Sequence, residues 1–493
     1  MPVTSDVCLV LEGTYPYIRG GVSSWVHQLA CSMQHLRFSL LIILPSRDYG
    51  REVKYDLPPN IVDISEVYLQ GFPIEKRRRG RVSPETLDIL RNFVRRIVND
   101  DLTAAFDLLD LMLGEDPELT AHDLLHGREC WDLLLELYNE YKLDVSFLDF
   151  FWTIRFALLP ILAVLQANIP HARVYHTICT GYAGILACCA LHQNPSSALL
   201  LTEHGIYAKE RMIELTEANW IYEENVRTRP GKELDFFRSW WTNLFYKMSH
   251  MTYDHCDEII TLYEGNRKLQ IRDGADPDKC HIIPNGMNIS KYKPNETIVP
   301  PSKKEKIIIS LVGRVVPIKD IKTFINACNL ICAADPRIEC WICGPTDEEM
   351  DYYGECLIHR GLLGLDERVI FKGMLKLIDF YPQMDILVLT SVSEAMPLVI
   401  LEAFCHSIPI VSTDVGACRE MLEGRTEADK MLGRSGYITG MSSPEETADA
   451  VLKIASDDQL YLDMGEAGRQ RLNAYYQEDD LFANYLNLYE RYL

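Results

Sequence analysis

The sequence predicts two α/β domains, each built on a parallel sheet with helices on both faces. Two series of short, continuous apolar runs alternate with helical patterns, one series in each half of the chain. Strands of this composition are typical of parallel sheets that are buried on both faces. The first series opens with an apolar run at 7–11, a Gly-rich loop, a helical stretch at 22–33 and a second run at 38–44, which is the order of a βαβ unit.

Length and composition limit the possible function classes. The 493 residues exceed what one hydrophobic core usually organises. A net charge of −22 excludes a non-specific nucleic-acid binder, because such a chain repels phosphate backbones. Fifteen cysteines without a disulfide framework point to buried thiols in a reducing compartment. The N-terminus lacks the basic segment of a signal peptide, so a cytoplasmic location is expected.

We expect the N-terminal domain to cover residues 1–295, with a helical insertion at about 75–150. Apolar residues recur at helical spacing after Ser83 and Pro84, which suit the cap and the first turn of a helix. A second helical pattern covers 121–141. The insertion therefore interrupts an otherwise alternating series of strands and helices.

The second domain is expected at 296–470, after a Pro- and Lys-rich stretch at 291–305 that is typical of a linker. Residues 471–493 are expected to form a C-terminal helix that packs back on the first domain. The most apolar stretch, 151–169, is interrupted by polar residues and predicts a buried helix rather than a membrane span. Candidate strands of the second domain are Ile307–Val312, Ile338–Cys343, Val369–Phe371, Ile386–Leu389 and Ile408–Ser412.

The most informative segment for function is 391–403, which joins a strand candidate to a helix. Unpaired amides at the start of such a helix form a ready site for a diphosphate. Glu394 lies in the loop and Glu402 inside the helix, so the two carboxylates can accept hydroxyls from two ends of one elongated ligand. The alternative from spacing alone is a capping and a surface glutamate. Between them lie Ala395, Met396, Pro397 and Leu398.

Other candidate residues follow strands in both domains. Arg314 and Lys319 lie between a buried strand and a helix, where cations bind phosphates in such folds; the alternative is a solvated basic pair. Gly20 and Gly21 precede a helix and resemble a phosphate-approach loop, although a Gly-Gly pair alone is weak support. His204 ends a strand and can donate a hydrogen bond to a ligand, or it is structural.

A metal site is not expected. The Asp-x-Asp sequence at Asp276 and Asp278 lies in a turn with Gly and Pro rather than at the end of an apolar strand. The charge of a departing diphosphate must then be stabilised by basic side chains and amides. The basic tract Lys76–Arg81 predicts a contact with an anionic membrane surface or an acidic partner, with a solvated loop as the alternative.

Several ordered motifs together resemble glycosyltransferase family 4. They are the Glu-x7-Glu pattern at 394–402, Gly313-Arg314 with Lys319, Val415-Gly416-Ala417, Pro284-Asn285-Gly286 and Thr202-Glu203-His204-Gly205. The loop at 11–25 and the helical insertion are similar to the PelF type of this family, which acts in Pel exopolysaccharide synthesis. That resemblance spans essentially the whole chain.

The resemblance implies a GT-B fold, in which two Rossmann-like domains face each other across a cleft, and transfer with retention at the anomeric carbon without a metal or other cofactor. It also implies a role for each candidate: Glu394 contacts the donor sugar, Glu402 the ribose, Arg314 and Lys319 the diphosphate, His204 the transferred sugar, and the amides of Gly20 and Gly21 the phosphate. Two departures fall beside these positions, because Asp320 and Ser407 stand where glycine is usual.

The implied substrates are a UDP-sugar donor, either a UDP-N-acetylhexosamine or UDP-glucose, and a glycan acceptor of an exopolysaccharide such as Pel. The implied partner is an inner-membrane polysaccharide synthase complex. Two other functions stay open at this point. One is a nucleotide-sugar-binding scaffold subunit of such a synthase, and the other is a GT-B nucleotide-sugar epimerase.

Overall fold

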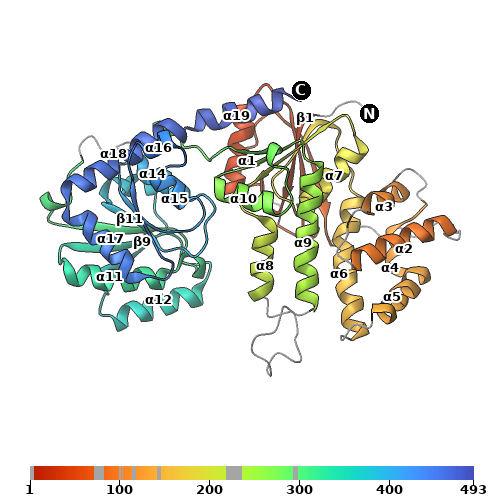
Figure 1. The fold of residues 1–493 in the computed structure, drawn as a ribbon, viewed down its shortest axis with the longest axis horizontal. Coiled ribbons are helices and arrows are strands. Elements are labelled where there is room, and N and C mark those ends of the chain that lie inside the picture. The colour runs from red at the N-terminus through yellow and green to blue at the C-terminus, as the bar shows by residue number, and fades with distance from the viewer. Residues whose placement is uncertain are drawn as a thin grey trace. The chain divides into compact units, whose positions relative to one another are not determined.

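The structure is a computed structural model, and it describes residues 5–50, 52–70, 83–98, 102, 104–113, 118–141, 146–217, 236–292 and 298–493. The chain divides into two compact units, whose elements are labelled in Figure 1. Unit 1 comprises Met1–Thr261, Arg267–His281 and Tyr485–Leu493, and unit 2 comprises Leu262–Asn266 and Ile282–Asn484.

Within the described residues, unit 1 contains a seven-stranded sheet in the order β3-β2-β1-β4-β5-β6-β7. Neighbouring strands from β3 through β6 are parallel. The order reverses between β1 and β4, and ligands of open α/β sheets bind at such a switch point. The strands are β1 (Ser5–Glu12), β2 (Phe38–Leu44), β3 (Ile61–Tyr68), β4 (Ala172–Thr177), β5 (Ala198–Glu203), β6 (Glu258–Thr261) and β7 (Cys280–Ile282).

Continuous apolar runs form the central strands of this sheet. Every residue of β2 is buried, as expected for a strand that helices cover on both faces. The helices that connect these strands are α1 (Gly21–Ser32), α7 (Tyr182–Gln193), α8 (Tyr207–Glu217), α9 (Phe236–His255) and α10 (Glu264–Arg272).

A group of helices is inserted between β3 and β4. They are α2 (Pro84–Val98), α3 (Ala105–Met112), α4 (Ala121–His126), α5 (Arg128–Tyr141) and α6 (Phe147–Leu165). Helix α2 packs on α3 and α5, and α3 and α6 pack on α7 of the sheet layer (Figure 1). The inserted helices therefore extend to Leu165, beyond the expected end at about 150.

The prediction of one helix over 121–141 is wrong at Gly127. The side chain of Thr120 caps α4, and the amide of Gly127 closes its last turn by donating to the carbonyl oxygen of Asp123 at 2.9 Å. Gly127 itself is extended, and a Cβ added there would lie 2.1 Å from that same oxygen. The absence of a side chain at Gly127 lets α4 end and α5 begin at once.

Helix α6 covers most of the apolar stretch predicted as a buried helix. It has 19 residues, and a window of 18 residues has a mean hydropathy of 1.8, so by length and composition this described helix is able to cross a membrane. Half of that window, 50%, is buried inside unit 1, with Phe150, Ile154 and Leu158 in the core. Core helices of folded proteins meet the same criteria, so composition alone does not assign α6 to a membrane.

The described residues of unit 2 form a six-stranded sheet in the order β10-β9-β8-β11-β12-β13, and every neighbouring pair is parallel. The order reverses between β8 and β11. The strands are β8 (Ile307–Val312), β9 (Ile338–Cys343), β10 (Val369–Gly373), β11 (Ile386–Leu389), β12 (Ile410–Thr413) and β13 (Gly436–Thr439).

Helices cover both faces of this second sheet. Helix α11 packs on α12 and α17, whereas α14 packs on α18 (Figure 1). Alternate residues of β8 enter the two apolar clusters, with Ile307 and Ile309 in one and Ile308 in the other, as the period of a strand requires. The helices are α11 (Ile321–Ala334), α12 (Met350–Leu362), α13 (Leu377–Phe380), α14 (Leu398–Cys405), α15 (Cys418–Glu423), α16 (Glu427–Lys430), α17 (Pro444–Ser456) and α18 (Asp458–Tyr475).

These two parallel-sheet units confirm the predicted fold class of two Rossmann-like α/β domains, with helices inserted in the first. The predicted strands 38–44, 307–312, 338–343 and 386–389 have the same bounds in the structure.

One cysteine pair, Cys340 and Cys343, has the C-x-x-C spacing of redox and zinc motifs. Both lie on β9, where residues three apart point to opposite faces of the sheet. Their side chains belong to different apolar clusters, so this pair is part of the core. All fifteen cysteines lie in the described part of the chain and are free thiols.

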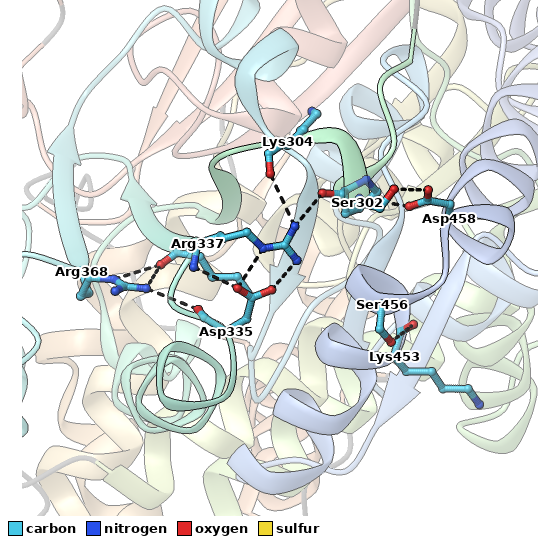
Figure 2. Close-up of polar contacts among 10 residues, drawn as sticks. Ser302, Lys304, Asp335, Arg337, Arg368, Lys453, Ser456 and Asp458 are labelled. Atoms are coloured by element: carbon cyan, nitrogen blue, oxygen red, sulfur yellow. Dashed lines mark hydrogen bonds and ion pairs between the residues drawn. The ribbon is translucent and has the colours of Figure 1, made fainter.

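The Pro- and Lys-rich stretch predicted as a linker ends in contacts within unit 2. Arg337 donates from Nη1 to the carbonyl oxygens of Pro301 at 3.2 Å and Lys304 at 3.5 Å (Figure 2). Its Nε and Nη2 atoms bind the two oxygens of Asp335 at 3.1 and 2.7 Å. One guanidinium group therefore holds the short turn at the end of this stretch against the start of β9.

A second contact holds the same turn from the other side. Asp458, at the start of α18, accepts the backbone N–H of Ser302 at 3.1 Å and also its hydroxyl (Figure 2). Because these bonds belong to unit 2, the division between the units falls at His281–Ile282 and not at the expected boundary after residue 295.

The C-terminal region is two helices rather than the one predicted over 471–493. Helix α18 ends at Tyr475, and α19 covers Glu478–Glu490. Between the two helices, Gln477 forms an isolated parallel bridge with Met287, whose amide donates to the carbonyl oxygen of Tyr476 at 2.8 Å. Only Tyr485–Leu493 belongs to unit 1.

Candidate functional site

The switch point of unit 2 brings together two of the predicted site residues. Lys319 lies in the loop after β8 and Glu394 in the loop after β11. The ammonium group of Lys319 forms an ion pair with Glu394 Oε1, and the hydroxyl of Ser391 donates to the same oxygen at 2.6 Å. The side chains of Lys319 and Glu394 are 20% and 12% exposed, so solvent screens this pair less than a surface pair.

Further hydrogen bonds fix these two loops to each other. The hydroxyl of Thr390 donates to the carbonyl oxygens of Lys319 and Asp320, both at 3.0 Å. The amide of Val392 donates to the carbonyl oxygen of Ile318 at 2.9 Å. The ion pair is therefore held on a rigid backbone at the carboxyl ends of the strands.

Arg314 is placed differently from Lys319. It follows β8 and forms an ion pair with Glu348, from the loop after β9. Both side chains are about half exposed, 54% and 48%, so this pair is weak and its guanidinium can exchange partners readily. A diphosphate can bind that guanidinium in a bidentate manner and carries more negative charge than the single Glu348 carboxylate.

The Val-Gly-Ala element supports the loop that carries Glu394. The amide of Ala417 donates to the carbonyl oxygen of Ala395 at 2.8 Å. Gly416 has a φ of +53°, and a Cβ added there would lie 2.3 Å from the carbonyl oxygens of both Ala395 and Glu394. The close approach of the two loops therefore requires glycine at 416.

Helix α14 begins directly after the Glu394 loop, with Pro397 as its N-cap and no side chain satisfying its first amides. Leu398 opens the helix, which starts one residue later than Pro397 suggests. The sulfur of Met396 accepts the amide of Asn285 at 3.3 Å, so the Pro-Asn-Gly element contacts the same loop. The predicted amides thus lie at a helix N-terminus that is open to an anion.

Glu402 lies inside α14, but it is not a surface residue. Its Oε2 atom accepts the hydroxyl of Tyr381 at 2.5 Å, and its Oε1 atom accepts the hydroxyl of Tyr292 at 3.4 Å. Burial raises the pKa of the Glu402 carboxyl, and the two hydroxyls oppose that shift. The ring of His406 stacks on Tyr381, with centroids 5.6 Å apart. Sequence reasoning found Glu402 and missed the rings that hold it.

Both departures from the family pattern occur at left-handed backbone. Asp320 has a φ of +46° and Ser407 a φ of +55°, a region that favours glycine. The side chain of Asp320 compensates, because it accepts the amide of Thr323 at 3.2 Å and caps α11. The Asp320 carboxylate therefore has a structural partner beside the proposed phosphate site.

In unit 1 the candidates lie on two neighbouring elements. Gly20 and Gly21 begin α1, and a Cβ at either position would meet no described atom within 4 Å. His204 follows β5, and burial lowers the pKa of its imidazole to about 4, so the ring is neutral at pH 7. Trp25, one turn into α1, contacts the His204 ring with centroids 5.0 Å apart. Sequence reasoning missed Trp25, although it ends the loop motif at 11–25.

Glu203, next to His204, is a further residue whose role was missed. It is fully buried, and it accepts the hydroxyl of Tyr253 at 2.8 Å, the amide of Tyr207 at 3.0 Å and the side-chain amide of Gln270 at 3.0 Å. Burial raises the pKa of this carboxyl, and these donors oppose the shift. Glu203 therefore fixes the end of β5, from which His204 extends.

The remaining sequence candidates are the Asp-x-Asp sequence and the basic tract. Asp276 caps a short turn by accepting the amide of Asp278 at 3.0 Å. In the part of the chain that the structure describes, no group of three or more His, Cys, Asp and Glu side chains is arranged to hold a metal ion. The basic tract Lys76–Arg81 lies outside the described residues.

The curated relatives described here each match less than half of the chain. D-inositol 3-phosphate glycosyltransferase of Corynebacterium glutamicum is 27% identical over 230 residues, covering 43% of this chain and 52% of that protein. N-acetyl-alpha-D-glucosaminyl L-malate synthase of Bacillus anthracis is 25% identical over 128 residues, covering 26% of this chain and 32% of that protein. The chain thus spans about half or less of the length of these curated relatives.

Solved structures match the chain over almost its whole length. Sucrose-phosphate synthase of Thermosynechococcus elongatus has a TM-score of 0.58 at 16% identity, covering 99% of this chain and 98% of its own. HepE of Anabaena, solved in complex with UDP and glucose, has a TM-score of 0.57 at 14% identity, covering 98% of this chain and 99% of its own. These likenesses are of fold, and the fold is GT-B.

Two family models divide the chain between them. One, described as "Glycosyl transferases group 1", matches residues 293–471, which contain Arg314, Lys319, Glu394 and Glu402. The other, described as "Domain of unknown function (DUF3492)", matches residues 5–278, which is more than half of the chain and contains Gly20, Gly21 and His204. The chain therefore belongs to the DUF3492 family and joins that domain to a glycosyl transferases group 1 domain.

Proposed function

We propose that this protein is a retaining glycosyltransferase that takes a hexose from a UDP-sugar and adds it to a growing exopolysaccharide such as Pel. The observation that carries the proposal is the arrangement of Lys319, Glu394 and Ser391 at the switch point of unit 2, beside the open N-terminus of α14. A cation, a carboxylate and free amides at one sheet edge suit a diphosphate joined to a sugar.

Each predicted residue has a role in this proposal. Arg314, Lys319 and the backbone N–H groups of Ala395, Met396 and Leu398 bind the diphosphate beside Pro397, while Glu394 orients the donor sugar. Glu402 accepts ribose hydroxyls with a carboxylate already fixed by Tyr381. In unit 1, His204 contacts the transferred sugar, and the amides of Gly20 and Gly21 approach the phosphate.

The proposed reaction needs no protein nucleophile. The bond between the anomeric carbon and the diphosphate oxygen breaks, and the acceptor hydroxyl oxygen bonds to that carbon from the same face. The acceptor's proton passes to the departing phosphate oxygen. Lys319, Arg314 and the α14 amides stabilise the negative charge that develops on the leaving group. Because these groups supply that stabilisation, we propose that transfer requires no metal ion.

For the donor, we propose a UDP-N-acetylhexosamine or UDP-glucose. Support comes from the relatives: HepE of Anabaena was solved with UDP-glucose, and the Bacillus anthracis relative is named for an N-acetylglucosaminyl product. For the location, we propose the cytoplasm, at the periphery of the inner membrane through a polysaccharide synthase complex. Fifteen free thiols support a reducing compartment.

One experiment tests the activity against both alternatives. The purified protein is incubated with UDP-glucose and with UDP-N-acetylhexosamines, with and without oligosaccharide acceptors, and with EDTA in a parallel set. We expect acceptor-dependent release of UDP and an α-linked product from an α-linked donor, unchanged by EDTA. An epimerised UDP-sugar would show the epimerase, and UDP binding without turnover of any donor would show the scaffold. Loss of activity in EDTA, restored by Mg²⁺ or Mn²⁺, would contradict metal independence.

A further inference from the structure

Residues 485–489 form part of the core of unit 1, the unit in which His204 also lies. Tyr485 and Tyr489, from the second half of α19, are fully buried in unit 1. The hydroxyl of Tyr489 lies 2.6 Å from Nδ1 of His176, and the hydroxyl of Tyr485 lies 2.9 Å from Oγ1 of Thr202. His176 Nε2 lies 2.8 Å from the same Thr202 oxygen, so the four side chains form one hydrogen-bonded chain.

Trp25 contacts both His204 and the hydrogen-bonded side chains of His176 and Tyr485. Its ring centroid is 5.0 Å from that of His204, 5.1 Å from that of Tyr485 and 6.0 Å from that of His176. The interplanar angles are 77°, 73° and 87°, so all three contacts are edge-to-face. Edge-to-face pairs are favourable and directional, which means that each ring constrains the orientation of the next.

Packing alone determines where the indole of Trp25 lies. Trp25 is 5% exposed, and its Nε1 atom is buried without a hydrogen-bond partner among the described residues. A buried indole that donated to a carbonyl would keep its position when one neighbouring ring was lost. Trp25 has no such bond, so removal of the Tyr485 ring leaves a space into which the indole can move. The His204 ring then loses its edge-to-face contact with the Trp25 indole.

We propose that Trp25 and Tyr485 are positioning residues for His204, so that the C-terminal residues of the chain orient the imidazole that contacts the transferred sugar. This proposal rests on the proposed function, because the role of His204 belongs to it. Tyr485 acts through Trp25. Its ring is the part that matters, and its hydroxyl serves the bond to Thr202.

The test uses the full-length protein with Tyr485→Ala, Tyr485→Phe, Trp25→Ala and Trp25→Phe. Tyr492→Ala is the matched control. Tyr492 is a tyrosine of the same segment, but its hydroxyl donates to Glu258 instead of to a residue that contacts Trp25. Three properties are measured for each variant: the affinity for UDP by calorimetry, kcat and KM with the UDP-sugar donor, and the imidazole pKa of His204 by NMR of labelled histidine. The His204 signal is assigned with His204→Gln.

We expect Tyr485→Ala and Trp25→Ala to lower kcat at least about tenfold, because a misplaced sugar contact acts on the transition state. Affinity for UDP alone should change less than about twofold, since UDP lacks the sugar that His204 contacts. Tyr485→Phe keeps the ring and should stay within about threefold of wild type, and Tyr492→Ala should match wild type.

The NMR measurement does not depend on any activity. Burial lowers the pKa of His204 to about 4. Loss of the Trp25 or Tyr485 ring should admit water and raise that pKa toward the ordinary value of about 6.5. Trp25→Phe keeps an apolar ring of smaller size, so it should show a smaller rise than Trp25→Ala and should fold even where Trp25→Ala does not.

Two results would overturn the proposal. One is a His204 pKa and a kcat that stay at wild-type values in Tyr485→Ala and Trp25→Phe. The other is an equal loss of kcat in Tyr485→Phe and Tyr485→Ala, together with weaker UDP binding, which would mean general destabilisation. If the wild-type protein transfers no sugar, the proposed function fails, while the NMR series still decides whether these rings position His204.

Discussion

At the scale of single residues, the two glutamates of the Glu-x7-Glu pattern have different surroundings, and this difference separates their roles. Glu394 is held by a cation and a hydroxyl, Lys319 and Ser391. Glu402 is held by the phenol groups of Tyr381 and Tyr292 inside unit 2. In the proposed function, a carboxylate paired with a lysine suits the donor sugar, whereas a fixed carboxylate inside the helix suits hydroxyls that do not change during the reaction.

The first prediction compares Glu394→Gln with Glu402→Gln. Glu394→Gln should lower kcat more than it weakens UDP binding, because UDP lacks the sugar and Lys319 becomes available to the diphosphate. Glu402→Gln should weaken UDP binding by about 1.5–3 kcal/mol, the usual loss for a hydrogen bond to a charged group. UDP titration and steady-state kinetics measure both effects, with Glu423→Gln, an exposed carboxylate paired with Arg419, as the control. Equal loss of UDP affinity in the two site variants, with kcat unchanged in Glu394→Gln, would contradict this division of roles.

A second residue-scale prediction concerns His406, whose ring stacks on Tyr381, the tyrosine that donates to Glu402. His406 is 2% exposed, and neither ring nitrogen has a hydrogen-bond partner among the described residues. Burial lowers the pKa of its imidazole to about 4. The unfolded chain therefore binds a proton at this histidine between pH 6.5 and 4 that the folded chain does not bind, so His406 destabilises the fold as pH falls through that range.

His406→Phe keeps a flat ring against Tyr381 and removes the titrating group. Wild type should lose stability relative to this variant by about 1.4 kcal/mol per pH unit below 6.5, or about 2 kcal/mol at pH 5. Urea unfolding of both proteins at pH 7, 6 and 5 measures the difference. Stability curves that stay parallel over this range would show that His406 takes up its proton in the folded protein.

At the scale of elements, the loop that carries Glu394 packs against a neighbouring loop at Gly416, which has no side chain. Gly416 and Gly433 both have positive φ, +53° and +85°. A Cβ at Gly416 would lie 2.3 Å from two carbonyl oxygens of the Glu394 loop, whereas a Cβ at Gly433 would meet no described atom within 4 Å. The two glycines therefore separate the cost of backbone strain from the cost of displacing the loop.

The third prediction uses this pair. Gly433→Ala should lower stability by about 1–2 kcal/mol, the cost of left-handed backbone for a residue with a Cβ, and should leave UDP affinity unchanged. Gly416→Ala should lower stability by at least as much and weaken UDP binding about tenfold or more, equivalent to about 1.4 kcal/mol, because the shifted loop carries the α14 amides. Thermal unfolding and calorimetry measure the two effects. UDP affinity that falls equally in both variants would mean that strain alone is responsible.

Sequence patterns predicted the elements whose signal is local. The strands 307–312 and 386–389 have the predicted bounds, because each is a continuous apolar segment between turn residues. Strand β3 was missed because every residue of this outer strand except Val67 is partly or fully exposed, and β13 because Gly436 and Thr439 leave it without a continuous apolar run. The break at Gly127 depends on one close backbone approach, which no periodicity reveals.

The candidate site was predictable only in part. Lys319, Glu394 and Glu402 could be selected as candidates because they lie at fixed offsets from a strand or a helix start. Trp25, Tyr381 and Tyr485 were not selected because their contacts join segments that are separated in the sequence. Asp320 illustrates a third case: it departs from the family pattern, yet its side chain makes the cap that offsets its left-handed backbone.

At the scale of the whole molecule, the chain crosses between the units at 261–262, 266–267, 281–282 and 484–485. The last crossing returns only Tyr485–Leu493 to unit 1. This short segment contributes two fully buried tyrosines to the core of the first unit. Residues 485–493 are therefore part of the fold of unit 1, and their removal should affect His204 before it affects Lys319 and Glu394 of unit 2.

The cysteines are also a property of the whole molecule. Twelve of the fifteen are buried, and Cys31, Cys179 and Cys332 are partly exposed. Burial raises the pKa of most of these thiols; for Cys332 and Cys340 the neighbouring thiol groups contribute most to the rise. Since the thiolate is the reactive form, both access and ionisation disfavour modification of the folded protein.

The fourth prediction is that the folded protein reacts slowly with a thiol reagent such as Ellman's reagent at pH 8, and that the three partly exposed cysteines react first. In guanidinium chloride without a reductant, all fifteen thiols should react quickly, because unfolding removes the burial that raised their pKa values. The number of groups released over time measures both stages, and Cys31→Ser should remove one group from the early phase. Fewer than fifteen groups in the unfolded protein would reveal a disulfide and would contradict a reducing compartment. Rapid reaction of most thiols in the folded protein would mean that the two cores open far more readily than their packing implies.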